Sequence, residues 1–168
     1  MPAAPAAELA EIEQAARQVI TALLARAETL GTAESLTGGW IGMALTSVPG
    51  ASAVYRGGMI TYSTELKAVL AGVSRMTLDR DGPVAASTAG ELAAGARSRC
   101  GADWGLAVTG VAGPDSQDGH PVGQVFVGLA GPQREIEVRE LALAGNRAEI
   151  RAATVARALG ALHRKLIS

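Results

Sequence analysis

The chain has 168 residues, of which 48% are hydrophobic but only 3% aromatic, so its length suits a single domain, residues 1–168, with a core of Ala, Val, Leu and Ile. Its 15 basic and 16 acidic residues leave a net charge of −1, which gives no electrostatic footprint for nucleic acid. Cys100 is the single cysteine, and it lies far in sequence from His120 and His163. We therefore expect no internal disulfide and no metal site.

The amino terminus begins with proline and alanine and then becomes acidic. It lacks the basic start and the apolar run of a signal peptide. No later stretch is long and apolar enough to span a bilayer. We expect a reduced cytoplasmic protein that does not contact a membrane.

Helical and strand patterns alternate along the first half of the chain. The first expected element is a long opening helix with apolar positions from Leu9 to Leu30 and an end at Gly31, followed by a short strand up to Ser35 and a helix over residues 37–48. A strand over 54–62, with a bulge or close backbone approach at Gly57 and Gly58, and a helix over 64–71 capped by Ser63 come next.

The second half changes from one helix to a strand hairpin and a closing helix. The expected elements are a helix from Ser87 to about Arg99, strands over residues 104–109, 122–129 and 136–141, and a last helix with Asn146 and Glu149 in a capping-box arrangement. Early alternation with a late hairpin predicts an α/β fold, a three-layer α/β/α sandwich around a mixed, mainly parallel sheet of about five strands.

A polar corner at Ser35 joins the first strand to the second helix. Gly38 and Gly39 let a ligand approach the backbone there and leave the first helical N–H groups open to an anion. A serine hydroxyl beside such N–H groups suits acyl transfer to an oxygen nucleophile. An ordinary helix start, capped by Ser35 or Thr37, would give the same pattern.

Several familiar catalytic patterns are missing from the sequence. There is no P-loop, no dinucleotide-binding glycine motif after a strand, no Gly-x-Ser-x-Gly and no Ser-x-x-Lys. A Ser-His-Asp triad would need His120 or His163. His163 falls in the last turn of a helix, where a surface position is expected, whereas His120 lies in a loop from which it could touch a ligand.

Ser35, Tyr62 and Lys67 are the remaining catalytic candidates. Tyr62 ends a strand and Lys67 lies in the first turns of the next helix, so both can reach a cleft at the strand ends. A lysine whose pKa is lowered by burial or by a nearby cation can act as the general base for serine. A tyrosine beside it can relay the proton or hold the lysine. The alternatives are a solvated helix lysine and a tyrosine at the edge of the core.

Further polar and glycine residues suit the binding of a nucleotide. Glu34 should point to the face opposite Ser35 and orient Lys67 or backbone amides. The loop 109–114 offers a hydroxyl and free N–H groups to a phosphate or ribose, unless it is a plain glycine turn. Arg147 places a cation beside the positive end of the last helix. The substrate-binding candidates are Glu34, Thr37, Gly38, Gly39, Thr109, Gly110, Gly113 and Arg147.

Taken in order, these blocks resemble the C-terminal domain of the CinA family (competence/damage-inducible protein). The matching blocks are residues 33–39 (AESLTGG), 58–63 (GMITYS), Lys67, 82–84 (GPV) with Ser87, 109–114 (TGVAGP) and 121–123 (PVG). The likeness covers nearly the whole chain, and several ordered motifs are more specific than one glycine turn.

The resemblance implies hydrolysis of the carboxamide of nicotinamide mononucleotide to nicotinate mononucleotide and ammonia, as part of pyridine nucleotide salvage. It implies that Ser35 is the nucleophile, Lys67 the base and Tyr62 their partner, with backbone N–H groups near Gly38 and Gly39 holding the oxyanion. Thr109 and Arg147 would bind the mononucleotide. It also implies a three-layer α/β/α fold, no cofactor and association into a homo-oligomer.

This chain departs from the family pattern at three places. Many members carry a cysteine where this chain has Leu36, so a thiol at that position cannot be the nucleophile here. The loop 115–120 is shorter than in many relatives, and Gln124 replaces a small hydroxyl residue, which bears on substrate affinity. A non-catalytic nucleotide-binding or competence-related interaction module, and an amidase for another phosphorylated amide, are the alternatives. The retention of serine and lysine together favours the enzyme.

Overall fold

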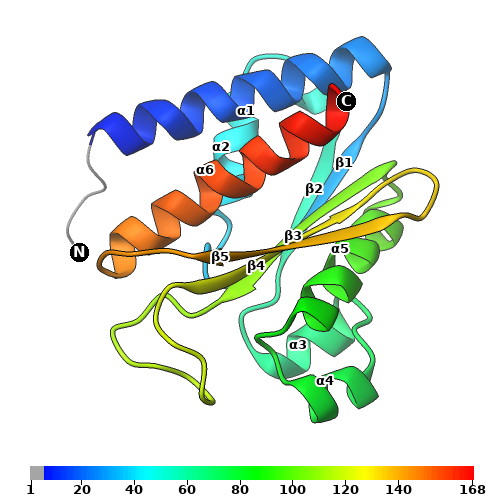
Figure 1. The fold of residues 1–168 in the computed structure, drawn as a ribbon. Helices are drawn as coiled ribbons and strands as arrows, with labels where there is room; N and C mark the ends of the chain where they lie inside the picture. Colours follow the sequence, from blue (N-terminus) through cyan, green and yellow to red (C-terminus); the bar gives the residue numbers. More distant parts are fainter. Residues whose placement is uncertain (1–5) are drawn as a thin grey trace.

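A five-stranded sheet lies between two layers of helices in the computed structural model, which describes residues 6–168 (Figure 1). The proline- and alanine-rich opening lies outside the described residues. The strands are β1 (Leu30–Glu34), β2 (Tyr55–Ile60), β3 (Trp104–Gly110), β4 (Gln124–Ala130) and β5 (Ile136–Ala142), in the order β2-β1-β3-β4-β5. The first three strands run parallel, and β4 runs antiparallel to both its neighbours. The predicted fold class is therefore confirmed.

Each face of the sheet has its own group of helices (Figure 1). The group on one face is α1 (Ala6–Arg26), α2 (Trp40–Thr46) and α6 (Arg147–Leu166), with the short 3₁₀ turn η1 (Ala51–Ala53). The group on the other face is α3 (Thr64–Val69), α4 (Arg75–Asp81) and α5 (Ala86–Cys100). In Figure 1, α1 and α6 lie side by side across the sheet.

The two faces differ in the size of the side chains that the central strand presents. Leu106 and Val108 of β3 pack in the core with α1 and α6. On the other face, Ala107 packs against α5, and a methyl group at Gly105 would overlap the carbonyl oxygen of Ala93. Small residues thus let the backbone of α5 lie directly on the sheet.

The end of the opening helix differs from the predicted one. The opening helix ends at Arg26, because Ala27 adopts a left-handed conformation and the chain turns into β1. Gly31 lies inside that strand, where a side chain would overlap Ala96 and Cys100 of α5. Close packing against α5, and not a helix end, therefore explains the glycine at this position.

Three cap predictions can be compared with the structure. Ser63 and Asn146 cap α3 and α6, and the Asn146–Glu149 capping box is present, as predicted. Ser87 does not cap α5, since its hydroxyl donates to Asp81. The helix α4, which we did not predict, begins at the cap Ser74.

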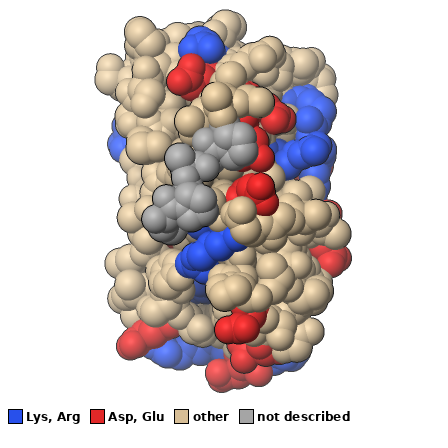
Figure 2. All heavy atoms as spheres, turned by 90° about the vertical axis from the view of Figure 1, so that its left-hand side faces the viewer, with Lys and Arg blue, Asp and Glu red and all other residues tan. Residues whose placement is uncertain are grey.

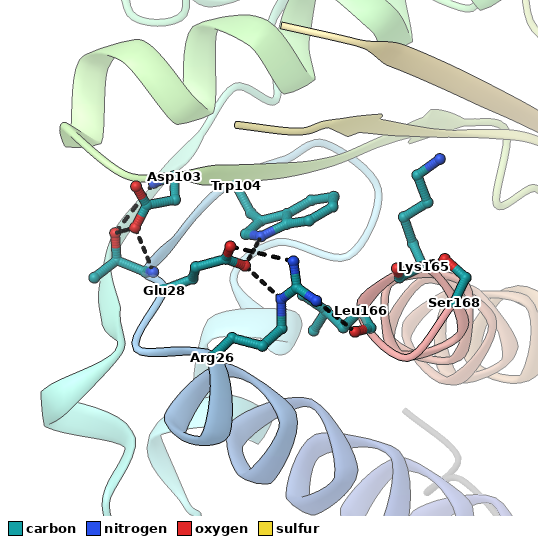
Figure 3. Close-up of polar contacts among 8 residues, drawn as sticks. Arg26, Glu28, Asp103, Trp104, Lys165, Leu166 and Ser168 are labelled. Carbon is teal, nitrogen blue, oxygen red and sulfur yellow. Dashed lines mark hydrogen bonds and ion pairs between the residues drawn. The ribbon is translucent and has the colours of Figure 1, made fainter. Parts of the chain in front are cut away.

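The amino ends of β1 and β3 are tied together by polar contacts (Figure 3). Glu28 accepts hydrogen bonds from the Arg26 guanidinium (2.6 Å) and from the Trp104 indole (2.7 Å). Arg26 also donates to the carbonyl oxygen of Leu166 at the end of α6 (3.1 Å). These contacts occupy one edge of the parallel strands and leave the carboxyl ends, at the opposite edge, for a site.

The charges on one face and the composition of the helices complete the description of the fold. Figure 2 shows charges of both signs among uncharged residues on one face of the molecule, with a small group of basic side chains at its upper right-hand edge. Within residues 6–168, no helix combines the length and the apolar composition needed to cross a membrane.

Candidate active site

A cavity of about 330 Å³ opens at the carboxyl ends of β1 and β3. Its walls come from the turn after β1, the segment from the end of β2 into α3, the loop between α4 and α5, the end of β3 with the loop after it, and the start of α6. The sequence-predicted residues that line it are Ser35, Tyr62, Lys67, Thr109, Gly110, Gly113 and Arg147.

Ser35 and Lys67 meet at the bottom of the site. The amine of Lys67 donates a hydrogen bond to the Ser35 hydroxyl (3.1 Å) and another to the carbonyl oxygen of Thr61 (2.7 Å). The backbone of Ser35 is fixed because its N–H donates to Val108 of the neighbouring strand β3. Lys67 projects from α3, whose first turn is set by the Ser63 cap. The structure therefore brings this predicted pair into direct contact.

Burial changes the acid–base properties of this lysine. Lys67 is only 1% exposed, and desolvation of the ammonium form lowers its pKa to about 8. Within residues 6–168 no carboxylate forms an ion pair with it. About a tenth of such amines are neutral at pH 7, and a neutral amine at 3.1 Å from the Ser35 hydroxyl can accept its proton.

Glu34 faces α2, on the opposite side of the sheet from Ser35. Its carboxylate accepts hydrogen bonds from the N–H groups of Ile41 (2.8 Å) and Gly42 (3.1 Å) and from the Thr37 hydroxyl (2.7 Å). It therefore holds backbone amides, one of the two roles expected from its position, and makes no hydrogen bond to Lys67. Because the carboxylate occupies the start of α2, those N–H groups are not open to an anion, contrary to our prediction.

The residues after Ser35 form a turn, and most of them do not line the cavity. The N–H of Gly38 donates to the carbonyl oxygen of Ser35 (3.0 Å). Glu34, Thr37, Gly38 and Gly39 thus build the turn, and the structure does not place them as substrate contacts. The Glu34 carboxylate, the Thr37 hydroxyl and the Gly38 N–H are satisfied within the turn or at the start of α2, which the residue pattern alone did not show.

Leu36 is the residue of this turn that does line the cavity. Within the described chain, the N–H groups of Leu36 and Thr37 have no hydrogen-bond partner. The Leu36 amide directly follows Ser35, where a donor for an oxyanion is needed. It replaces the amides near Gly38 and Gly39 as the candidate donor.

Arg147 connects two walls of the cavity. Its guanidinium donates to the carbonyl oxygen of Gly113 (2.7 Å) and to the Tyr62 hydroxyl (3.1 Å). Tyr62 is 61% exposed, and no hydrogen bond joins it to Ser35 or Lys67 within the described residues. The structure therefore places Tyr62 with Arg147 at the rim, and it does not place this hydroxyl in the proton path that we expected.

The loop after β3 supplies the remaining wall. The buried Thr109 hydroxyl donates to the carbonyl oxygen of Pro83 (2.7 Å) and so joins two lining segments. Asp115 and Gln117 also line the cavity, although only their place in a polar loop pointed to them in the sequence. His120 does not line it: its Nδ1 lies 2.8 Å from the side-chain oxygen of Gln124.

Two further observations complete the description. Arg151 of α6, which we did not single out in the sequence, donates to the carbonyl oxygens of Leu36 and Thr37 behind Ser35. Within residues 6–168, no group of three or more His, Cys, Asp or Glu side chains is arranged to hold a metal ion.

Comparison with known protein families gives one clear match. The family model described as the CinA C-terminal domain matches residues 12–166. A CinA-like protein of Frankia casuarinae is 48% identical over 148 residues, which cover 88% of this chain and 34% of the relative. A putative competence-damage inducible protein of Levilactobacillus brevis is 45% identical over 148 residues, which cover 88% of this chain and 36% of the relative. The chain thus spans about a third of these relatives.

Solved structures show the same fold. The competence/damage inducible protein CihA from Agrobacterium tumefaciens is similar with a TM-score of 0.90 and 37% identity, over 100% of both chains. A competence-damaged protein (CinA) superfamily protein from Escherichia coli is similar with a TM-score of 0.87 and 30% identity, over 94% of this chain and 90% of that one.

Proposed function

This chain belongs to the CinA C-terminal domain family, and we propose that it hydrolyses the carboxamide of nicotinamide mononucleotide to nicotinate mononucleotide and ammonia. The observation that carries the proposal is the buried amine of Lys67 against the Ser35 hydroxyl at the bottom of the cavity. A buried lysine without a carboxylate partner has no evident structural use, whereas a serine nucleophile needs a neutral base at this distance.

The first half of the reaction forms an acyl-enzyme. Ser35 Oγ attacks the amide carbon while Lys67 Nζ takes the hydroxyl proton. The carbonyl oxygen becomes an oxyanion, which the Leu36 N–H stabilises. The C–N bond then breaks, and Lys67 passes its proton to the leaving nitrogen, which departs as ammonia.

The second half restores the enzyme. A water molecule attacks the ester carbon, and Lys67 takes one of its protons. The bond from the carbon to Ser35 Oγ breaks, and Lys67 returns the proton to that oxygen. The product leaves as nicotinate mononucleotide, and the sequence of steps uses no metal or organic cofactor.

The rim of the cavity suits the rest of the substrate. Arg147 has no carboxylate in ion-pair distance within the described chain, so its charge is available to a phosphate in addition to its contacts with Gly113 and Tyr62. The volume of about 330 Å³ is in the range of small-molecule sites.

A second candidate is a nucleotide-binding module without catalysis. It is favoured by one observation: Glu34 occupies the amides at the start of α2, so fewer donors are left for an oxyanion. An amidase for another phosphorylated amide is the third candidate, because the same pair would act on any amide that fits.

The test is ammonia release from nicotinamide mononucleotide by the purified chain. We expect turnover in the wild type and a loss of about 10³-fold or more in Ser35→Ala and Lys67→Met. The control is Lys165→Met, which changes the other lysine of the chain, on the surface of α6, and should keep full activity. Saturable binding without turnover, weakened by Arg147→Ala, would instead support the binding module. Release of ammonia only from another phosphorylated amide would support the third candidate.

A further inference from the structure

Arg151 holds the turn behind Ser35 from the side of α6. Its Nε donates to the carbonyl oxygen of Leu36 (2.8 Å), and its Nη2 donates to that of Thr37 (3.1 Å). The guanidinium carbon lies 5.6 Å from the centre of the Trp40 ring, which is a favourable distance for a cation–π contact. The side chain is half-buried and has no carboxylate in ion-pair distance among the described residues.

These two contacts fix the direction of backbone N–H groups. In a trans peptide the N–H points away from the carbonyl of the same unit, and the cis bond within residues 6–168 lies elsewhere, before Pro114. Holding the Leu36 carbonyl therefore sets the direction of the Thr37 N–H. Holding the Thr37 carbonyl likewise sets the Gly38 N–H, which donates to the carbonyl oxygen of Ser35.

The turn needs such support because of its own composition. Gly38 and Gly39 both have positive φ angles (59° and 100°), and glycine gives the backbone access to many other conformations. On the side of the sheet, the Glu34 carboxylate accepts a hydrogen bond from the Thr37 hydroxyl. Arg151 of α6 supplies the second set of contacts, through its hydrogen bonds to the carbonyl oxygens of Leu36 and Thr37.

We propose that Arg151 is a positioning residue for acyl transfer at Ser35. It does not line the cavity, so it acts on the substrate only through the turn. Through the Gly38 N–H, which donates to the Ser35 carbonyl oxygen, it keeps the peptide unit that carries the unpaired Leu36 N–H in the orientation that offers this group to an oxyanion, and it keeps the Ser35 hydroxyl on Lys67. The inference rests on the proposed function for its reaction, although its geometry does not depend on which amide is the substrate.

The first test compares substitutions on one helix. The variants are Arg151→Met and Arg151→Lys, and the matched control is Arg157→Met, which changes an exposed arginine of α6. Since loss of one oxyanion donor costs about 10²–10³-fold, we expect a misplaced donor in Arg151→Met to lower kcat by about 10- to 100-fold. KM should stay within about twofold, because binding at the rim is untouched.

The partial rescue distinguishes positioning from a loss of folding. Arg151→Lys can still donate to one carbonyl, so its kcat should lie between those of the wild type and Arg151→Met, and added guanidinium should raise the activity of Arg151→Met. An unchanged kcat in Arg151→Met would overturn the inference. If Arg151→Met folds poorly, Arg151→Lys decides the question: a well-folded Arg151→Lys that loses as much kcat as Arg151→Met would also overturn the inference. A change in KM alone, with kcat unchanged, would overturn it as well.

The second test does not need the substrate. A fluorophosphonate probe reacts when Ser35 Oγ forms a bond to phosphorus, the P–F bond breaks, fluoride leaves and Lys67 takes the proton. Intact-mass spectrometry gives the labelling rate, which should fall by about tenfold in Arg151→Met and stay unchanged in Arg157→Met. A wild-type rate in Arg151→Met would overturn the inference.

The two tests separate this inference from the proposed function. Labelling that slows in Arg151→Met, together with no ammonia from nicotinamide mononucleotide in the wild type, would support positioning by Arg151 and reject the substrate. A wild type that is neither labelled nor active would show that Ser35 is not a nucleophile, and both proposals would then fall.

Discussion

The amine of Lys67 lies 3.1 Å from the Ser35 hydroxyl, and within the described chain no carboxylate forms an ion pair with it. A carboxylate partner would stabilise the ammonium form and remove the base that a serine nucleophile needs. Burial without a partner does the opposite, because it lowers the pKa of the amine to about 8. The ability of Lys67 to accept the Ser35 proton therefore depends on its burial without a carboxylate as much as on the distance between its amine and the Ser35 hydroxyl.

The rate should rise with pH as Lys67 loses its proton. We expect kcat/KM to increase about tenfold per pH unit well below pH 8, where the ammonium form dominates, and to level off above the pKa of about 8. The measurement is ammonia release between pH 6.5 and 9.5, with circular dichroism to show that the fold persists. A rate that is independent of pH over this range would mean that Lys67 is not the proton acceptor.

The same buried amine should cost stability at neutral pH. The pKa of Lys67 is about 8 in the folded chain, against 10.5 for a free side chain, so between these two values the unfolded state binds more protons and stability rises with pH. Below pH 8 both states are protonated and the cost of burying the ammonium is fully present. Lys67→Met should therefore raise the free energy of unfolding by up to about 3 kcal/mol at pH 7, and by less as the pH approaches 10.5.

Urea unfolding at pH 7 and at pH 10 measures this effect, with Lys165→Met as the control on the surface. The control should change stability by less than about 0.5 kcal/mol at either pH. A Lys67→Met variant that is less stable than the wild type at pH 7 would show that the two hydrogen bonds of Lys67 outweigh its desolvation.

Tyr62 should affect substrate binding more than the chemical step. Its hydroxyl contacts the Arg147 guanidinium (3.1 Å) and not Lys67, so Tyr62→Phe removes one contact of the rim. We expect KM to rise by a few-fold, as for one hydrogen bond to a charged group, with kcat nearly unchanged. Steady-state kinetics on nicotinamide mononucleotide measures both. A loss of kcat as large as that of Lys67→Met would restore the proton-relay role expected from the sequence.

Local sequence signals predicted much of the fold. The caps at Ser63 and Asn146 act within four residues, so the pattern of side chains is enough to find them. Ser35 and Lys67 follow strands that run parallel, which places them at one edge of the sheet. The predicted contact between them follows from that topology.

Contacts set by tertiary packing could not be predicted in this way. Arg151 reaches Leu36 across 115 positions of the chain, and that contact depends on how α6 packs against α2. The same holds for Glu34, whose carboxylate turns to the start of α2. Sequence spacing gave the face of the strand on which Glu34 lies, but not the amides that meet it there.

The close packing of α5 on the sheet can be tested with a pair of glycines. A methyl group at Gly105 would overlap the backbone of Ala93 and Arg97, neither of which can move without shifting α5, so Gly105→Ala should destabilise the fold by about 1–3 kcal/mol or more. Gly160→Ala is the matched change in α6. Its methyl group would meet only the flexible end of Arg164 at 3.4 Å, and it should stabilise the helix by about 0.5–1 kcal/mol. Thermal and urea unfolding measure both. Equal effects of the two substitutions would mean that α5 can move away from the sheet at little cost, and the small residues of β3 would then need another explanation.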